Sequence, residues 1–187
     1  MPLIRETIVI TVGAEGRLHI APLGLIAEDD DWIIAPFRPS TTLDNLMAVP
    51  FATASHTDDV RVFAGCLTGR HDWPTVPADE VPVARLADAL SHTELAVIEV
   101  REDQQRPRLR CRMVREVSHG PFHGFNRAQA AVVEAAILVS RLNMLPRDKI
   151  DREIAYLQTA VDKTAGPRER EAWGWLVEKV HRHFAGT

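Results

Sequence analysis

The hydrophobic pattern of this 187-residue chain changes its period near Gly120. Before that point, short stretches rich in β-branched residues alternate apolar with polar positions, a pattern typical of strands. In residues 108–117, for example, Leu109, Cys111 and Met113 alternate with arginines. After that point, apolar residues recur every three or four positions, which indicates amphipathic helices. The sequence therefore predicts a mainly β domain over residues 1–118 and a helical segment over residues 119–187.

The β domain is predicted to consist of strands joined by short turns, with two short helices between them. The expected strands are residues 4–12, 17–26, 32–37, 51–56, 60–68, 95–100 and 108–117, and the expected helices are residues 41–49 and 83–91. So many strands with short connections favour a closed or nearly closed antiparallel barrel.

The helical segment is predicted to contain three helices. Asn126 has the position of an N-cap, with Gln129 at the third helical position, and Pro146 ends this first helix. The second and third helices carry apolar residues at helical spacing: Ile150, Ile154, Leu157 and Val161, then Trp173, Leu176, Val180 and Phe184. Because every helix has an apolar face, we expect this segment to pack on the barrel.

Charge and cysteine usage restrict the partners and the compartment. The formal net charge is -4, the sequence pI is about 6.1, and the two signs are interspersed. Nucleic acids and anionic membranes attract a basic excess, so neither is an expected partner. Cys66 and Cys111 lie in apolar stretches and are interpreted as buried thiols of a reducing compartment. With no signal-peptide core or long apolar run in the sequence, we expect a cytoplasmic protein.

A hydroxyl-rich turn before the helix at residues 41–49 is the first candidate site. Arg38 and Ser40 precede Thr41 and Thr42, and Thr41 with Asp44 has the spacing of a capping box. A helix start offers unpaired N–H groups and the positive end of the helix dipole, which suits a phosphate. A capped helix with no ligand is the simpler interpretation of the spacing alone.

Two other segments are candidates. In residues 18–25, small residues and Pro22 within a strand would let a flat ring approach the backbone, although a barrel bulge with no ligand is the simpler interpretation of this segment alone. His119 and His123 could ligate zinc on one helix, but Gly120 and Pro121 predict a loop, and we expect no metal site. That loop is interpreted as a rim that contacts a ligand or a neighbouring subunit, or as plain surface.

The order of these segments resembles the FMN-binding split-barrel superfamily. His19-Ile20-Ala21-Pro22-Leu23-Gly24 is similar to that superfamily's Asn-x-Ala-Pro-Met-Gly stretch, with His19 for Asn and Leu23 for Met. Residues 38–46 are similar to its phosphate-side turn, which is followed by Asn-Leu. Residues 125–128, with Glu134 and residues 140–142, resemble a flavin-reductase-like branch of unknown function from methanogens and methylotrophs.

This resemblance implies an α+β, mainly β fold: an antiparallel split β-barrel with a C-terminal helical segment. It also implies a homodimer that holds FMN at its interface. The phosphate would lie near Arg38, Ser40, Thr41, Thr42 and Asn45, and the ring along Ala21, Pro22, Leu23 and Gly24. His19, Asn126 and Arg127 complete the candidate cofactor residues.

Two classes of function follow from the resemblance. The first is a flavin-dependent oxidoreductase that acts on an unidentified small molecule. The alternative is a non-catalytic FMN-binding protein, or a structural dimer that uses the barrel only as an interface. Because a flavin carries its own redox chemistry, the sequence assigns no catalytic residue.

Overall fold

The computed structural model describes residues 2–186, and the chain forms two compact units. The barrel unit ends at Thr57, resumes at Trp73 and finishes at Phe122. The helical unit comprises Asp58–Asp72 and the residues from His123 onward.

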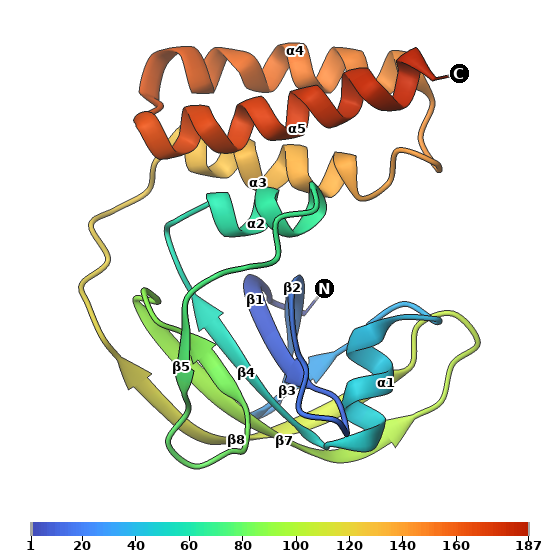
Figure 1. The fold of residues 1–187 in the computed structure, drawn as a ribbon, viewed down its shortest axis with the longest axis vertical. Helices are drawn as coiled ribbons and strands as arrows, with labels where there is room; N and C mark the ends of the chain where they lie inside the picture. Colours follow the sequence, from blue (N-terminus) through green and yellow to red (C-terminus); the bar gives the residue numbers. More distant parts are fainter. Residues whose placement is uncertain (1, 187) are drawn as a thin grey trace. The chain divides into compact units, whose positions relative to one another are not determined.

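Six strands of the barrel unit close into a barrel in the order β1-β2-β3-β8-β7-β4, and all neighbours are antiparallel (Figure 1). This confirms the predicted barrel. The strands are β1 (Ile4–Val12), β2 (Leu18–Glu28), β3 (Asp31–Ile34), β4 (Phe51–His56), β7 (Ser91–Arg101) and β8 (Arg108–Ser118).

The barrel core is filled from the strands and from one helix, α1 (Thr41–Ala48). Val9, Ala54 and Leu95 come from neighbouring strands, while Leu43 and Leu46 come from α1. Alternate residues of a strand point to opposite faces. Leu109 and Cys111 of β8 face inward as the alternation predicts, whereas Met113 on the same strand is exposed. The same packing holds the start of α1 against the barrel.

β2 is paired unequally on its two sides. On one side it pairs with β1 from Leu18 to Ile26, but on the other side β3 pairs only with Ile26, Ala27 and Glu28. Among the described residues, no strand pairs with that second edge of β2 over residues 18–25. The barrel therefore offers a stretch of open strand edge, which is where the split-barrel resemblance places the flavin ring.

A two-stranded arm, β5 (Thr75–Pro77) and β6 (Ala84–Leu86), belongs to the same unit. Hydrogen bonds hold it to the barrel: the Thr53 hydroxyl donates to the Ala84 carbonyl over 2.6 Å, and the Leu86 N–H donates to Ser55 Oγ over 3.1 Å. Polar residues on β4 are buried here because the arm supplies their partners.

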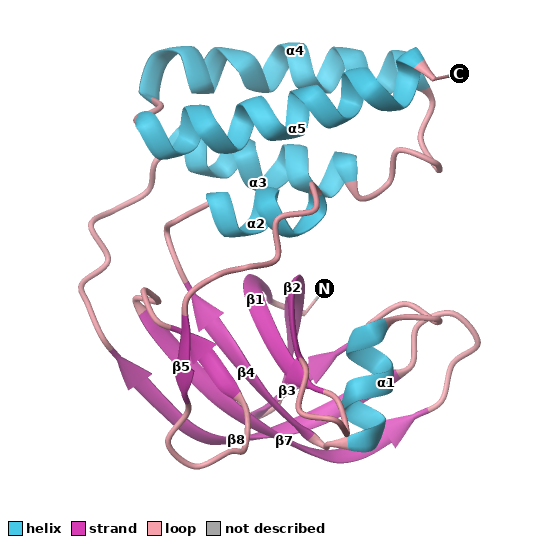
Figure 2. Ribbon diagram, in the orientation of Figure 1, coloured by secondary structure: helices cyan, strands magenta, loops and turns pink. Residues whose placement is uncertain are grey.

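Four helices form the helical unit (Figure 2): α2 (Arg61–Leu67), α3 (Arg127–Val139), α4 (Arg147–Thr164) and α5 (Pro167–Ala185). The three helices predicted after Gly120 are confirmed, with Asn126 as the N-cap of α3. α3 packs against α4 and α5, and α2 packs against α3 and α5. The shared core includes Val132, Val139, Ile150, Leu176 and Val180.

Two predicted secondary-structure elements are wrong. Residues 60–68 form the helix α2 rather than a strand, and residues 83–91 form β6 and a turn rather than a helix. Both stretches are short and apolar, and over such a length the periods of a helix and a strand cannot be told apart. The tertiary environment decides: α2 packs on helices, and β6 pairs with β5.

The two cysteines are free thiols, but only Cys111 is buried, and Cys66 is half-buried. Burial raises the pKa of the Cys111 thiol to about 12. Over residues 2–186, no helix combines the length and apolar character needed to cross a bilayer.

Candidate functional site

The turn before α1 is a helix start capped by a serine. Ser40 is the N-cap, and its Oγ accepts the Leu43 N–H over 3.3 Å. The predicted capping box from Thr41 to Asp44 is not formed, because the helix begins one residue earlier, at Ser40, and the Asp44 N–H donates to the Ser40 carbonyl. Helix geometry leaves the N–H groups of Thr41 and Thr42 without acceptors in the helix. These donors and the helix dipole favour a negatively charged group at this turn.

Arg38 lies at the mouth of the same turn and is 46% exposed. Its guanidinium pairs with Glu102 over 2.8 Å, and its backbone N–H donates to the Gln105 carbonyl. Since this ion pair is exposed, it holds Arg38 only weakly, and a phosphate could compete for the guanidinium.

A second guanidinium, Arg106, reaches this region, and the sequence analysis missed it. Arg106 donates to the Ala35 carbonyl through both Nε and Nη2, and its guanidinium lies 4.6 Å from the ring centre of Phe37. No motif pointed to Arg106, because the connection between β7 and β8 brings it here from far along the sequence. The contact with Ala35 indicates that Arg106 stiffens the approach to α1.

Asn45 fastens α1 to the barrel. It is buried, and its Nδ2 donates to Thr11 Oγ1 over 3.0 Å. A Cβ on Gly13 would lie 3.1 Å from Asn45 Oδ1, so the backbone approaches closely here. Thr11 is the cross-strand partner of His19. This chain of contacts links the turn before α1 to the beginning of β2, although Asn45 itself is engaged in packing.

The predicted ring segment lies on β2 beside its open edge. Ala21, Pro22, Leu23 and Gly24 are all half-buried. The Leu23 carbonyl accepts a hydrogen bond from Thr7 Oγ1 over 2.9 Å. Pro22 has no N–H to offer a neighbouring strand, which suits an edge without a partner.

Gly24 has a packing role of its own on this strand. A Cβ on Gly24 would lie 2.7 Å from Ile4 Cγ2, so a neighbouring side chain already uses the space that the missing Cβ leaves. The close approach that the sequence predicted at this position is therefore made, at least in part, by β1.

Asn126 and Arg127 belong to the helical unit, unlike the other candidate residues. Asn126 Oδ1 accepts the N–H groups of Ala128 and Gln129, and its Nδ2 donates to the Thr164 carbonyl. This amide thus caps α3 and joins it to α4. Arg127 is exposed at the first position of α3.

A buried polar cluster on β7 was not predicted at all. The carboxylate of Glu94 is fully buried and accepts the backbone N–H groups of Asp79, Glu80 and Val81 over 2.8–2.9 Å. It also lies 3.1 Å from His92 Nε2. Burial alone would raise the pKa of Glu94, but these hydrogen bonds outweigh it, and the pKa of the carboxyl lies below its usual value.

This cluster continues to the surface. His92 Nδ1 lies 2.9 Å from His119 Nε2, and the two rings are stacked. Burial, together with the charge of Arg85, lowers the pKa of His119. Ligand atoms of Asp79, His92 and Glu94 lie within 4.8 Å of one another, as in some cation sites. However, hydrogen bonds engage both oxygens of Glu94, so we interpret the cluster as a clamp on residues 79–81.

The loop prediction for residues 119–126 is confirmed, because neither a helix nor a strand forms between β8 and α3. His119 and His123 are therefore not placed on one helix face.

Two family models match this chain and identify its protein family. The N-terminal domain of a protein family of unknown function, DUF447, matches residues 5–120, and a second DUF447 domain matches residues 126–178. The chain belongs to the DUF447 family. No curated protein matches the sequence.

Solved structures with the same fold include a member of this family. An FMN-bound DUF447 protein from Methanosarcina mazei is 19% identical, with a TM-score of 0.84 over 96% of each chain. The 2-nitrobenzoate 2-nitroreductase of Pseudomonas fluorescens is 19% identical, with a TM-score of 0.53 over 64% of this chain and 66% of that one. An FMN-binding protein from Thermus thermophilus, with bound cyclohexenone, is 17% identical, with a TM-score of 0.52 over 63% and 71%. These similarities establish the split-barrel fold of this DUF447 protein.

Proposed function

We propose that this DUF447 protein binds FMN and acts as a flavin-dependent oxidoreductase on a small molecule. The observation that carries the proposal is the turn before α1, which combines unpaired helix N–H groups, hydroxyls and the exposed Arg38. The fold of the chain is also that of an FMN-bound member of the same family. When bound, FMN supplies the redox chemistry, and the residues of the chain bind and orient it.

In this proposal the turn before α1, the edge of β2 and Asn45 each contribute to FMN binding. Ser40, Thr41, Thr42 and Arg38 hold the phosphate. The open edge of β2 lies along the ring, and His19 stands at the near end of that strand. Asn45 acts indirectly, since it fixes α1 to Thr11.

The experiment is a titration of FMN and riboflavin against the wild-type protein and Arg38→Ala. The FMN phosphate is mostly dianionic at neutral pH. Loss of the guanidinium should weaken FMN by ~1.5–3 kcal/mol, the scale of a hydrogen bond to a charged group. Riboflavin lacks the phosphate and should lose much less. The matched control is Glu102→Gln, which releases Arg38 from its ion pair and should preserve or strengthen FMN binding.

The outcomes separate the possible roles of Arg38. Equal losses for both flavins would show that Arg38 acts through the stability of the fold. No loss for either flavin would place the phosphate elsewhere and contradict the assignment of this turn.

We propose that the FMN-binding form is a homodimer. The unpaired edge of β2 and the exposed apolar side chains of Ile98, Val100 and Met113 on β7 and β8 leave surface that a second copy would cover. Light scattering at micromolar concentration should give twice the mass of the chain. A stable monomer would contradict this arrangement.

The non-catalytic alternative is tested with the same protein. Purified holoprotein should be yellow, and a colourless protein that does not take up FMN would leave only a structural role. Bleaching of bound FMN by NADH or NADPH in a stopped-flow instrument supports the oxidoreductase. Stable colour with both donors favours a protein that stores or carries the flavin.

A further inference from the structure

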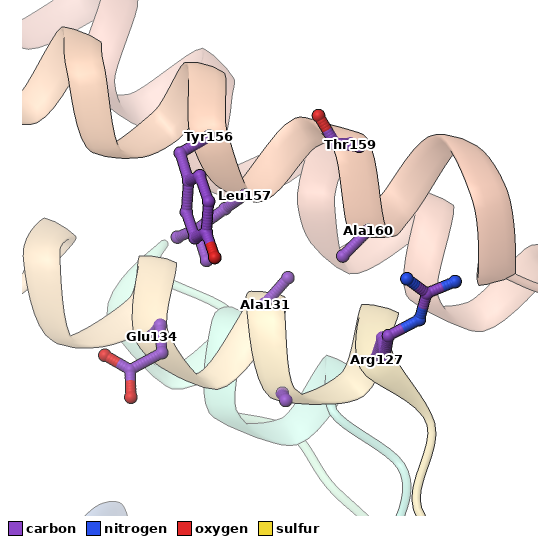
Figure 3. A pocket seen from close by; sticks show the side chains of 8 residues that line it. Arg127, Ala131, Glu134, Tyr156, Leu157, Thr159 and Ala160 are labelled. Atoms are coloured by element: carbon purple, nitrogen blue, oxygen red, sulfur yellow. The ribbon is translucent and has the colours of Figure 1, made fainter.

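Two features of the structure have no role in the proposed flavin site. One is a groove between α3 and α4 with a volume of about 280 Å³. Figure 3 shows the guanidinium of Arg127 at one end of this groove and the carboxylate of Glu134 pointing away from it, so the two charges do not face a common ligand. The other feature is the continuous array of Glu94, His92 and His119 in the barrel unit, which reaches from the interior to the surface.

The direction of each hydrogen bond in this array follows from Glu94. Its pKa lies below the usual value because hydrogen bonds outweigh the cost of burial, so the carboxylate is charged and can only accept. His92 Nε2, 3.1 Å from Glu94 Oε1, must therefore carry a proton. In a neutral His92 ring, Nδ1 is then an acceptor, and His119 Nε2, 2.9 Å away, supplies the N–H.

Nδ1 of His119 is the basic atom at the outer end of the array. His119 is exposed, whereas His92 is fully buried. Within residues 2–186, the bond to His92 is the one hydrogen bond that the His119 side chain makes. A proton from solvent therefore enters the array at this atom.

We propose that the array is a proton relay that moves one proton from the surface to His92. Solvent protonates His119 at Nδ1, and the proton between the rings passes from His119 Nε2 to His92 Nδ1. His92 becomes an imidazolium beside the Glu94 carboxylate, and His119 ends neutral, in its other tautomer. No hydrogen bond is lost, because His119 Nε2 now accepts from His92 Nδ1. The exposed Nδ1 of His119 changes from an acceptor to a donor, so the surface at this point responds to pH.

The charges around the array favour His92 over His119 as the ring that holds the positive charge. The buried carboxylate that His92 contacts attracts a cation strongly, because little water screens the pair. Burial and the charge of Arg85 on β6 lower the pKa of His119. Asp79 faces His119 with the opposite effect, but its carboxylate is already paired with Arg115 over 3.0 Å.

The two rings should take up one proton together, not two. A second proton would place N–H groups on both of the nitrogens that face each other over 2.9 Å. His56 on β4 also faces His92, but burial lowers the pKa of His56, helped by the charge of Arg5 and opposed by that of Glu116. His56 therefore stays neutral while the array takes up its proton.

The experiment is an NMR titration of the full-length protein with isotope-labelled histidine, in the presence of EDTA, from about pH 8.5 to about pH 5, which spans the ordinary pKa of histidine. Long-range proton–nitrogen spectra distinguish protonated from bare ring nitrogens. At high pH, Nε2 should carry the proton in both rings. At low pH, His92 should be protonated on both nitrogens and His119 on Nδ1 alone, with one midpoint common to the two rings.

Two variants shift this titration in opposite directions. Glu94→Gln removes the charge that draws the proton inward, so the midpoint should fall by about one pH unit or more, and both nitrogens of His119 should then be protonated. Arg85→Gln removes a charge that opposes uptake and should raise the midpoint with the tautomers of wild type. It tests the relay independently of any loss of stability in Glu94→Gln. His123→Gln is the matched control, since His123 is an exposed histidine of the same loop as His119, and it should change nothing.

Four results would overturn the proposal. These are protonation of both His119 nitrogens in the wild-type protein while His92 Nδ1 stays bare, uptake of two protons by the folded pair, an unchanged tautomer of His119 over the whole range, or a midpoint that Arg85→Gln does not raise. The titration is made on flavin-free protein, so its result is independent of whether the barrel unit binds FMN.

Discussion

Burial of the Glu94 carboxylate costs free energy, but its hydrogen bonds allow it to stabilise the fold. Its carboxylate is fully buried, and the backbone N–H groups of Asp79, Glu80 and Val81, with His92, supply donors to both oxygens. Glu94→Gln replaces one oxygen by an NH₂ group, which would face N–H donors. We expect the free energy of unfolding at pH 7 to fall by about 3 kcal/mol, measured by urea denaturation.

The contribution of Glu94 to the stability of the fold should decrease at acid pH. The pKa of Glu94 lies below its usual value in the folded protein. Its contribution to stability is therefore full above the unfolded-state pKa of about 4.3 and is lost as the pH falls through the lower, folded pKa. Glu94→Gln should flatten the stability curve of the protein in that acid range. Glu80→Gln is the control, because the Glu80 side chain is exposed and contributes its backbone N–H to the clamp. An equal loss in both variants would contradict the assignment.

Many of these side-chain contacts could not be predicted from the sequence. Ser40, Thr41 and Thr42 identified the turn correctly, because hydroxyl residues before a helix are a local signal. Arg106 and Glu94 gave no such signal, since their partners are far along the chain or are backbone groups. Local chemistry can be predicted from spacing, but a contact that tertiary folding creates cannot.

At the scale of elements, long periodic segments were predicted well and short ones were not. The helices α3, α4 and α5 each span several turns, so their apolar faces are unambiguous. The 7-residue α2 and the 3-residue β6 were both misassigned. Their secondary structure is set by what they pack against or pair with, which no local pattern records.

The cap of α3 gives a test at the element scale. In Asn126→Ala, the Ala128 and Gln129 N–H groups lose their common acceptor, and the Thr164 carbonyl loses a donor. We expect thermal denaturation to show a loss of about 1–2 kcal/mol. Asn126→Asp keeps the capping oxygen and should lose less. If Asn126→Ala instead lost FMN affinity with unchanged stability, Asn126 would be a flavin ligand, as the family resemblance implies.

At the scale of the whole molecule, the connection between the units constrains what can be removed. The chain leaves the barrel unit after β4, forms α2 in the helical unit and returns before β5. Within the helical unit, α2 packs on α3 and α5 and buries Val62 and Phe63. A truncation after Gly120 removes α3, α4 and α5 but leaves α2 behind, with these side chains exposed.

We therefore expect the chain ending at Gly120 to aggregate or to unfold without cooperativity. Each exposed valine or phenylalanine side chain forfeits about 1.5–3 kcal/mol, and a whole domain has only about 5–15 kcal/mol of net stability. The control replaces residues 59–72 of the truncated chain by a short Gly/Ser linker, which removes α2 together with its partners. If exposure of α2 is the cause, this second variant should regain solubility and a cooperative urea transition. Cooperative folding of the simple truncation would show that α2 does not depend on the helices that cover it. Failure of both variants would show that the barrel needs the helical unit for more than covering α2.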